Sequence, residues 1–339
     1  MSAVTQAGAE APLVEVRDLN VRFVSREATV QAVNGVSFTV ARGQVLGVIG
    51  ESGSGKSVMM RSLMRLNPRR RTVTSGFMRV GAHDILALGE REMTNIRGAT
   101  IAMVFQEPMT ALDPLYTVGD QIAETVMRHA GRSREAAMER ALELLELVRV
   151  PSPERRLKTF PHELSGGLRQ RAMIAVALSC RPSILLADEP TTALDASVQI
   201  QVLVLLRRLQ REMGMSMIFV THDLGVAAQI ADKVAVMYAG RIIEYGDVND
   251  VLMHPKHPYT LGMLASTVHG AVRQATIEAI PGSPPDLRAL PPGCSFAARC
   301  KLALPACRAA FPAPVTDAGG HIAHCIRIGE WAAARAESA

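Results

Sequence analysis

The sequence is poor in aromatic residues and holds no long uncharged apolar run. Aromatic residues make up only 4% of the 339 residues, which argues against the stacking platforms that bind single-stranded nucleic acid. No stretch approaches the roughly 18 apolar residues that a membrane-spanning helix needs. The start of the chain, MSAVTQAGAEAPLVEV, lacks the basic residues and apolar core of a secretory signal. We therefore expect a globular chain that works in the cytoplasm without a nucleic-acid partner.

Cysteine is scarce until the last fifth of the chain. Cys180 stands alone in the apolar run AMIAVALSC, where we expect a buried structural thiol. The net charge of +5 suits work at an anionic surface, but we expect Arg69-Arg70-Arg71, after a proline, to form a solvated loop. The clustering of the other four cysteines marks a separate unit: Cys294, Cys300, Cys307 and Cys325.

The order of apolar patterns predicts an α/β fold. Residues 13–24 alternate as in a half-buried antiparallel strand, whereas 183–188 and 216–221 are short apolar runs typical of buried parallel strands. Residues 198–214 between those runs predict a crossover helix. We expect a nucleotide-binding domain over 13–247, with an antiparallel β subdomain and a helical subdomain at about 107–165. An irregular, proline-rich extension should occupy 248–339.

The stretch GESGSGKS follows the apolar run VLGVI and precedes a predicted helix over 57–66. It matches G-x-x-x-x-G-K-[ST], the loop whose main-chain N–H groups surround the phosphates of a nucleotide. Lys56 would reach the β- and γ-phosphates and Ser57 would ligate Mg²⁺. The pattern therefore predicts binding of ATP with Mg²⁺ by the loop residues Gly50, Ser52, Gly53, Ser54, Gly55, Lys56 and Ser57.

Two adjacent acids close the strand SILLAD. Asp188 is the expected second protein ligand of Mg²⁺. Glu189 projects differently and could act as the general base, or the orienting group, for the water that attacks the γ-phosphate. The alternative is an acidic pair that caps the following turn.

Further motifs, in a fixed order, resemble those of the ATP-binding cassette (ABC) ATPases. LSGGLRQR, residues 164–171, is similar to the family's signature motif, and LLADEPTTALD follows it at a similar spacing. Gln106 matches the Q-loop, residues 193–195 (ALD) match the D-loop, and His222 matches the switch histidine. The resemblance implies a P-loop NTPase fold of the RecA-like kind. Phe23, which we expect in the loop after the first strand, is similar to the aromatic residue that stacks on adenine.

The resemblance also implies a role for each matched residue. Ser165, Gly166 and Gly167 would form a second phosphate-binding cradle that faces the nucleotide of an opposite subunit, with Asp195 nearby. His222 would hold the γ-phosphate and the attacking water. Gln106 would contact Mg²⁺ and transmit the state of the γ-phosphate to the helical subdomain.

Longer segments, such as IRGATIAMVFQEPMTALDPLYTVGDQI and HPKHPYTLGMLAS, resemble the oligopeptide/dipeptide/nickel importers, in particular their first, D-type ATPase subunit. That resemblance implies a peripheral subunit at the cytoplasmic face of the inner membrane. Its partners would be a second ATPase subunit, as a heterodimer, two membrane permeases and an external binding protein that acts through the permeases. The cargo would be a peptide, with nickel or another small solute as the alternative.

Two other classes of function remain as alternatives. Soluble cassette ATPases that act on DNA or ribosomes usually carry two cassettes or long coiled coils, whereas this chain has one P-loop and no sustained heptads. A non-hydrolysing sensor subunit is the other alternative. The intact Lys56, Asp188, Glu189 and His222 weigh against it.

The four late cysteines have the spacing C-x5-C-x6-C-x17-C. Disulfides are disfavoured in a reducing cytoplasm, and structural zinc usually uses a C-x₂₋₄-C pair, which is absent here. Four thiolates without such pairs suit a [4Fe–4S] cluster, and the pattern CSFAARCKLALPAC resembles the cysteine motif of this importer branch, which implies the same cluster. Zinc with help from His321 or His324, and no metal at all, stay open. The bound group would fold an extension too short to bury its own core.

Overall fold

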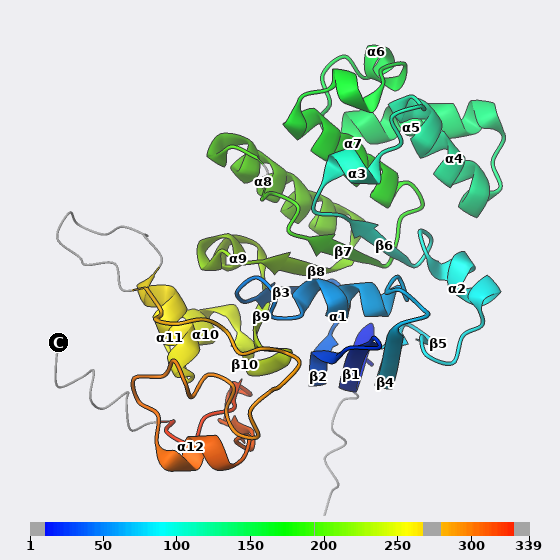
Figure 1. Ribbon diagram of the computed structural model, residues 1–339. Coiled ribbons are helices and arrows are strands. Elements are labelled where there is room, and N and C mark those ends of the chain that lie inside the picture. The colour runs from blue at the N-terminus through cyan, green and yellow to red at the C-terminus, as the bar shows by residue number, and fades with distance from the viewer. Residues whose placement is uncertain (1–10, 193, 267–278, 329–339) are drawn as a thin grey trace, which may run out of the picture.

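The computed structural model describes residues 11–192, 194–266 and 279–328. The N-terminal stretch on which the signal-peptide expectation rests lies largely outside these residues. Two sheets and a group of helices make up the molecule, with the C-terminal segment at one side (Figure 1). In the part of the chain that is described, no helix combines the length and the apolar character needed to cross a membrane.

The smaller sheet is antiparallel and has four strands in the order β2-β1-β4-β5. Alternation along its strands places residues such as Val14, Val16 and Val21 in the core, as expected for a sheet with one covered face. These side chains share a core with Met59 and Met60 of the first helix. The strands are β1 Val14–Val24, β2 Thr29–Val40, β4 Thr72–Val80 and β5 His83–Asp84.

The larger sheet has eight strands in the order β11-β12-β10-β9-β3-β8-β7-β6. Its central strands run parallel, and β3, β7 and β8 are buried along their whole length. Their carboxyl ends therefore meet at one edge, where ligands bind in open α/β sheets. The strands are β3 Val45–Ile49, β6 Ile101–Val104, β7 Ile184–Asp188, β8 Ser216–Thr221, β9 Lys233–Tyr238 and β10 Arg241–Asp247.

Helices connect and cover these strands. The predicted crossover helix is present between β7 and β8. The helix after the phosphate loop was predicted over 57–66 but ends at Leu63, because the chain turns at Arg65, whose φ is +51°. The helices of this part are α1 Lys56–Leu63, α2 Glu90–Ile96, α8 Ala196–Met213 and α9 Leu224–Ile230.

A helical segment is inserted between β6 and β7 and lies away from the antiparallel sheet (Figure 1). Its longer helices have clear boundaries: Thr117 caps α4 by accepting a hydrogen bond from Asp120 N at 3.2 Å, and Gly131, with φ +62°, ends it. Cys180 follows the last helix and is partly buried, so the expectation of a buried thiol was too strong. The helices are α3 Pro108–Ala111, α4 Val118–Ala130, α5 Arg134–Leu147, α6 Pro153–Leu157, the 3₁₀ turn Pro161–Glu163 and α7 Gly166–Leu178.

The C-terminal segment is more regular than its prolines predicted. It begins with two helices and returns to the main sheet, where β12 pairs with β10. Phe296 packs on Tyr238 and Tyr259 with ring centroids 5.4 Å apart in each pair, so the segment shares a core with β9. Its elements are α10 Val248–Met253, α11 Pro258–Ala265, α12 Pro305–Ala309, β11 Val315–Thr316 and β12 Ile322–Ala323.

Candidate nucleotide site

A cleft of about 1070 Å³ opens at the carboxyl edge of the parallel strands. The phosphate loop lines it together with residues of β1 and β2, the loops after β6, β7 and β8, and the C-terminal segment. All seven predicted loop residues, Gly50 and Ser52 to Ser57, line this cleft together with Gln106, Glu189 and His222. The structure therefore brings together residues that lie up to 172 positions apart, from Gly50 to His222.

The phosphate loop needs glycine where the backbone turns tightly against its neighbours. Gly55 has φ +100°, and a Cβ there would lie 2.3 Å from the carbonyl oxygen of Ala32. A Cβ on Gly50 would lie 2.2 Å from the carbonyl oxygen of Met237. Any larger residue at either position would force the loop away from the strands that support it.

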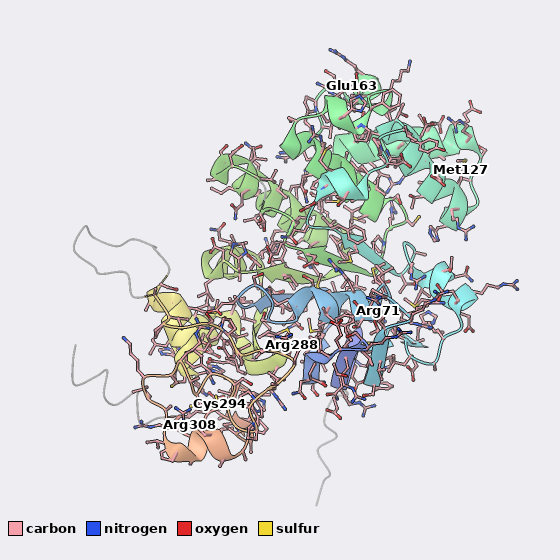
Figure 2. The ribbon with its side chains drawn as sticks, viewed as in Figure 1. Arg71, Met127, Glu163, Arg288, Cys294 and Arg308 are labelled. Carbon is pink, nitrogen blue, oxygen red and sulfur yellow. The ribbon has the colours of Figure 1, made fainter. Side chains whose placement is uncertain are left out.

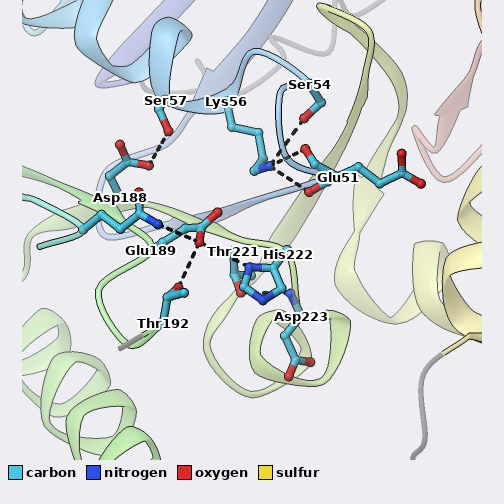
Figure 3. Close-up of polar contacts among 12 residues, drawn as sticks. Glu51, Ser54, Lys56, Ser57, Asp188, Glu189, Thr192, Thr221, His222 and Asp223 are labelled. Atoms are coloured by element: carbon cyan, nitrogen blue, oxygen red, sulfur yellow. Dashed lines mark hydrogen bonds and ion pairs between the residues drawn. The ribbon is translucent and has the colours of Figure 1, made fainter. Parts of the chain in front are cut away.

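Lys56 is 4% exposed and its ammonium lies inside the loop. Nζ donates to the carbonyl oxygens of Gly50 at 2.7 Å and Glu51 at 2.8 Å (Figure 3). Burial lowers the pKa of Lys56, while the carboxylates of Glu189, Asp188 and Glu51 oppose that shift. A buried cation held by neutral carbonyls is well placed to attract an anion.

Ser57, on α1, and Asp188, at the end of β7, bring two side-chain oxygens together. The Ser57 hydroxyl donates to Oδ1 of Asp188 at 2.8 Å, and Asp188 is 1% exposed. Burial raises the pKa of Asp188, while its bond from Ser57 and the charge of Arg61 lower it. A hydroxyl and a carboxylate are the hard oxygen ligands that Mg²⁺ takes, so this pair fits the predicted ion.

Glu189 lies at the centre of a polar junction beside the phosphate loop (Figure 3). Its Oε2 accepts from Thr192 Oγ1 at 2.9 Å and Gln106 Nε2 at 3.4 Å, and lies 3.2 Å from Nδ1 of His222. The backbone of Glu189 is in the left-handed region, with φ +45°, a conformation that is uncommon outside glycine and found at functional sites. Thr192, three residues beyond Glu189, carries no motif of its own, and only the fold shows its contact with the carboxylate.

The signature motif does not line the cleft that holds the phosphate loop. Ser165 precedes α7 as its N-cap residue, and Ser165 and Gly166 are exposed. Among the described residues, those that line the cleft do not include Ser165, Gly166 or Gly167. Asp195 caps α8 by accepting from Val198 N at 3.0 Å, whereas Ala193 of the same motif lies outside the described residues. One chain therefore does not bring its own signature motif to its own phosphate loop.

Phe23 lines the cleft, as its predicted contact with adenine requires. It does not lie in a loop after the first strand, as the sequence indicated. Phe23 belongs to β1 and pairs with Val30 on one side and Thr72 on the other. The strand runs to Val24, as the alternation over 13–24 predicted, and its pairing with β2 and β4 includes Phe23.

The four late cysteines line one small cavity in the C-terminal segment, together with His257, Phe296 and other residues. Burial, and then the neighbouring Cys325, Cys300 and Cys307, raise the pKa of Cys294 to about 11. Cys294 lies well away from Glu163 of the helical segment (Figure 2). In the part of the chain that is described, no three His, Cys, Asp or Glu residues form a group able to hold a metal ion.

The two histidines considered as zinc ligands have other partners. His321 Nε2 lies 2.8 Å from Oε1 of Glu244, and His324 Nδ1 lies 2.9 Å from the carbonyl oxygen of Pro312. Neither histidine is among the described residues that line the cysteine cavity. The geometry thus gives no support to zinc held with help from His321 or His324.

Comparison with known proteins identifies relatives that match most of this chain. Residues 33–192 match the ABC transporter family model, and residues 243–307 match the model of the oligopeptide/dipeptide transporter C-terminal region. A dipeptide transport ATP-binding protein of Bacillus subtilis is 47% identical over 92% of this chain and 94% of its own length. An oligopeptide transport ATP-binding protein of Salmonella typhimurium is 47% identical over 88% of this chain and 89% of its own.

Solved structures agree with this assignment. The ATP-binding cassette MJ0796, in a dimeric post-hydrolysis state bound to ADP and Pi, is similar with a TM-score of 0.62 and 30% identity, covering 69% of this chain and 98% of that one. The cassette fold expected from the sequence is therefore confirmed. The chain belongs to the ABC transporter family and is an ABC ATPase.

Proposed function

We propose that this chain is the ATP-hydrolysing subunit that powers import of peptides through a membrane permease. Its relatives across nearly the whole length are dipeptide and oligopeptide transport ATP-binding proteins, and the C-terminal match belongs to the same group. In this proposal residues 13–247 are the ATPase domain and 248–339 the importer-type extension. The chain would lie at the cytoplasmic face of the membrane, as a peripheral subunit.

The observation that carries the hydrolytic role is the junction at Glu189. Its carboxylate, supported by Gln106 and Thr192 and close to His222, faces the cleft that holds Lys56. We assign Glu189 to polarise the attacking water, His222 to orient it, and Gln106 to contact the metal and sense the γ-phosphate. Mg²⁺, held by Ser57 and Asp188, would supply charge neutralisation at the phosphates.

Glu189→Gln tests this assignment. Loss of a positioned base removes roughly 10²-fold or more of the rate, while the amide keeps the size of the side chain. We expect ATP binding to persist, turnover to fall by about that factor and the closed dimer to accumulate. Turnover within a few-fold of the wild type would show that another group activates the water.

A complete site requires a second chain. Because the signature residues Ser165, Gly166 and Gly167 lie outside the cleft of their own chain, we propose that they complete the partner's site. The N-terminus of α7 would supply main-chain N–H groups to the partner's nucleotide. The similarity to a dimeric cassette supports this arrangement, and we propose a heterodimer with a second ATPase subunit.

The permease would contact the helical segment just beyond Gln106. Three large apolar residues are exposed there: Leu115 is 79% exposed, Tyr116 56% and Met109 53%. A cluster of exposed apolar side chains marks a contact surface. Since the same short stretch begins at Gln106, whose amide contacts Glu189, a change at the nucleotide would be transmitted to this surface. Transport itself would take place in two permease subunits fed by an external binding protein.

We propose that the four cysteines hold a [4Fe–4S] cluster, as their number and their spacing in the sequence indicate. All four line one cavity, yet no three are grouped to hold one ion in the described part of the chain. A [4Fe–4S] cluster is held by four Cys thiolates, and the shared cavity is what supports the proposal. Such a cluster, when bound, would stabilise the segment around Phe296, and we assign it a structural role.

Anaerobic purification of the full chain tests the cluster. We expect brown protein with about four irons and four sulfides per chain, lost in Cys300→Ser. Cys180→Ser is the matched control, because Cys180 lies outside the cavity, and it should keep the iron. Colourless protein with stoichiometric zinc, or iron unaffected by Cys300→Ser, would rule the cluster out.

A further inference from the structure

The C-terminal segment reaches the phosphate loop directly. Glu51 is the second residue of that loop, and its carboxylate accepts from Nη1 of Arg299 at 2.8 Å. Arg299 lies immediately before Cys300 and 248 positions away from Glu51 in sequence. Neither contact partner was identified by the sequence analysis, since a lone arginine between two cysteines carries no signal of its own.

Arg299 is rigidly held. Its side chain is 7% exposed, and it donates from Nε to the carbonyl oxygen of Pro281 at 2.8 Å and from Nη1 to the Tyr238 hydroxyl at 3.2 Å. Because several fixed groups orient the guanidinium, it can fix the Glu51 carboxylate in turn.

A second contact ties the same residue of the loop to the same segment. The main-chain N–H of Glu51 donates to the hydroxyl of Tyr259 at 3.0 Å. Tyr259 is fully buried on α11 and packs on Tyr238 with ring centroids 4.7 Å apart. The C-terminal segment thus holds Glu51 twice: Tyr259 binds its backbone N–H and Arg299 binds its carboxylate.

The charge of Glu51 makes the contact important for nucleotide binding. A carboxylate within a loop that binds phosphates repels the negatively charged ligand unless a cation compensates it. The ammonium of Lys56 bonds the carbonyl oxygen of Glu51 and makes no hydrogen bond to its carboxylate, although it feels the charge of that carboxylate. The guanidinium of Arg299 contacts the carboxylate instead.

We propose that Arg299 is a positioning residue for the nucleotide site: it neutralises Glu51 and holds it against the C-terminal segment, so that this segment sets the affinity of the phosphate loop for ATP. The inference rests on nucleotide binding by the cleft, which the wild-type titration checks first. ATP affinity therefore depends on the C-terminal segment through one ion pair.

The test measures the Kd of MgATP by calorimetry for the full chain and four variants. Arg299→Gln leaves Glu51 uncompensated and should raise the Kd about tenfold. Glu51→Gln alone removes the repulsive charge and should stay within about threefold of the wild type. The double variant Glu51→Gln/Arg299→Gln should recover to the same range, and Arg299→Lys, which keeps the charge, should as well.

Two results would overturn the proposal. One is a Kd for the double variant as high as that of Arg299→Gln, because the damage would then come from lost packing and not from the charge of Glu51. The other is a Kd unchanged in Arg299→Gln. If that variant does not fold, Arg299→Lys decides: a tenfold loss despite the retained charge contradicts the proposal. Failure of the wild type to bind MgATP would instead refute the nucleotide site itself.

Discussion

Glu244 on β10 is a fully buried carboxylate that joins the main sheet to the C-terminal segment, and its removal should destabilise that junction. Four donors converge on it: the backbone N–H of Lys256 at 2.5 Å, that of His257 at 3.0 Å, the hydroxyl of Thr260 at 2.5 Å and Nε2 of His321 at 2.8 Å. Glu244→Ala leaves all four without their acceptor. At about 1 kcal/mol for each orphaned donor, the free energy of unfolding should fall by about 4 kcal/mol.

Urea unfolding followed by circular dichroism measures this change, and limited proteolysis shows where the chain opens. We expect the first cleavages of Glu244→Ala to fall after residue 247, with the cassette core still protected. The matched control is Glu143→Ala on α5, whose side chain is 63% exposed and pairs with Arg140; it should cost about 0.5 kcal/mol or less. A loss below about 1 kcal/mol for Glu244→Ala would refute the bonding described here.

Three further changes test the nucleotide site. Lys56→Ala should weaken ATP binding itself, because the ammonium pairs with phosphates in the ground state; unchanged affinity in calorimetry would contradict the phosphate-loop assignment. Gly55→Ala should have the same effect, since the added Cβ meets Ala32 at 2.3 Å, whereas Gly53→Ala, where nothing lies within 4 Å, should be milder. Ser165→Arg in a mixed dimer should disable the partner's site; nucleotide cross-linking that reports damage only at the mutant chain's own loop would exclude a composite site.

The residues that could be predicted from the sequence are those whose chemistry depends on neighbours in the chain. The phosphate loop is fixed by glycines and Lys56 within eight residues, and Asp188 and Glu189 follow directly from the end of a buried strand. Parallel pairing of β3, β7 and β8 then brings their ends together. Local pattern and sheet topology were sufficient for this part.

The rest depends on contacts between distant segments, which no local pattern encodes. Arg299 and Glu51 lie 248 positions apart in the sequence. Glu244 of β10 likewise contacts residues between 256 and 260 and, much later in the chain, His321. The prolines after Gly246 indicated irregular structure, but two of them, Pro258 and Pro305, begin the helices α11 and α12, where the missing N–H costs nothing.

If ATP hydrolysis by this chain drives peptide import, uptake by a reconstituted complex must depend on it. The wild-type chain, its partner ATPase and the two permeases are placed in proteoliposomes, and entry of a labelled peptide delivered by the binding protein is measured. We expect uptake that requires MgATP and is abolished when Glu189→Gln is present. Uptake unaffected by Glu189→Gln, or an ATPase activity stimulated by DNA or ribosomes without any peptide uptake, would contradict it.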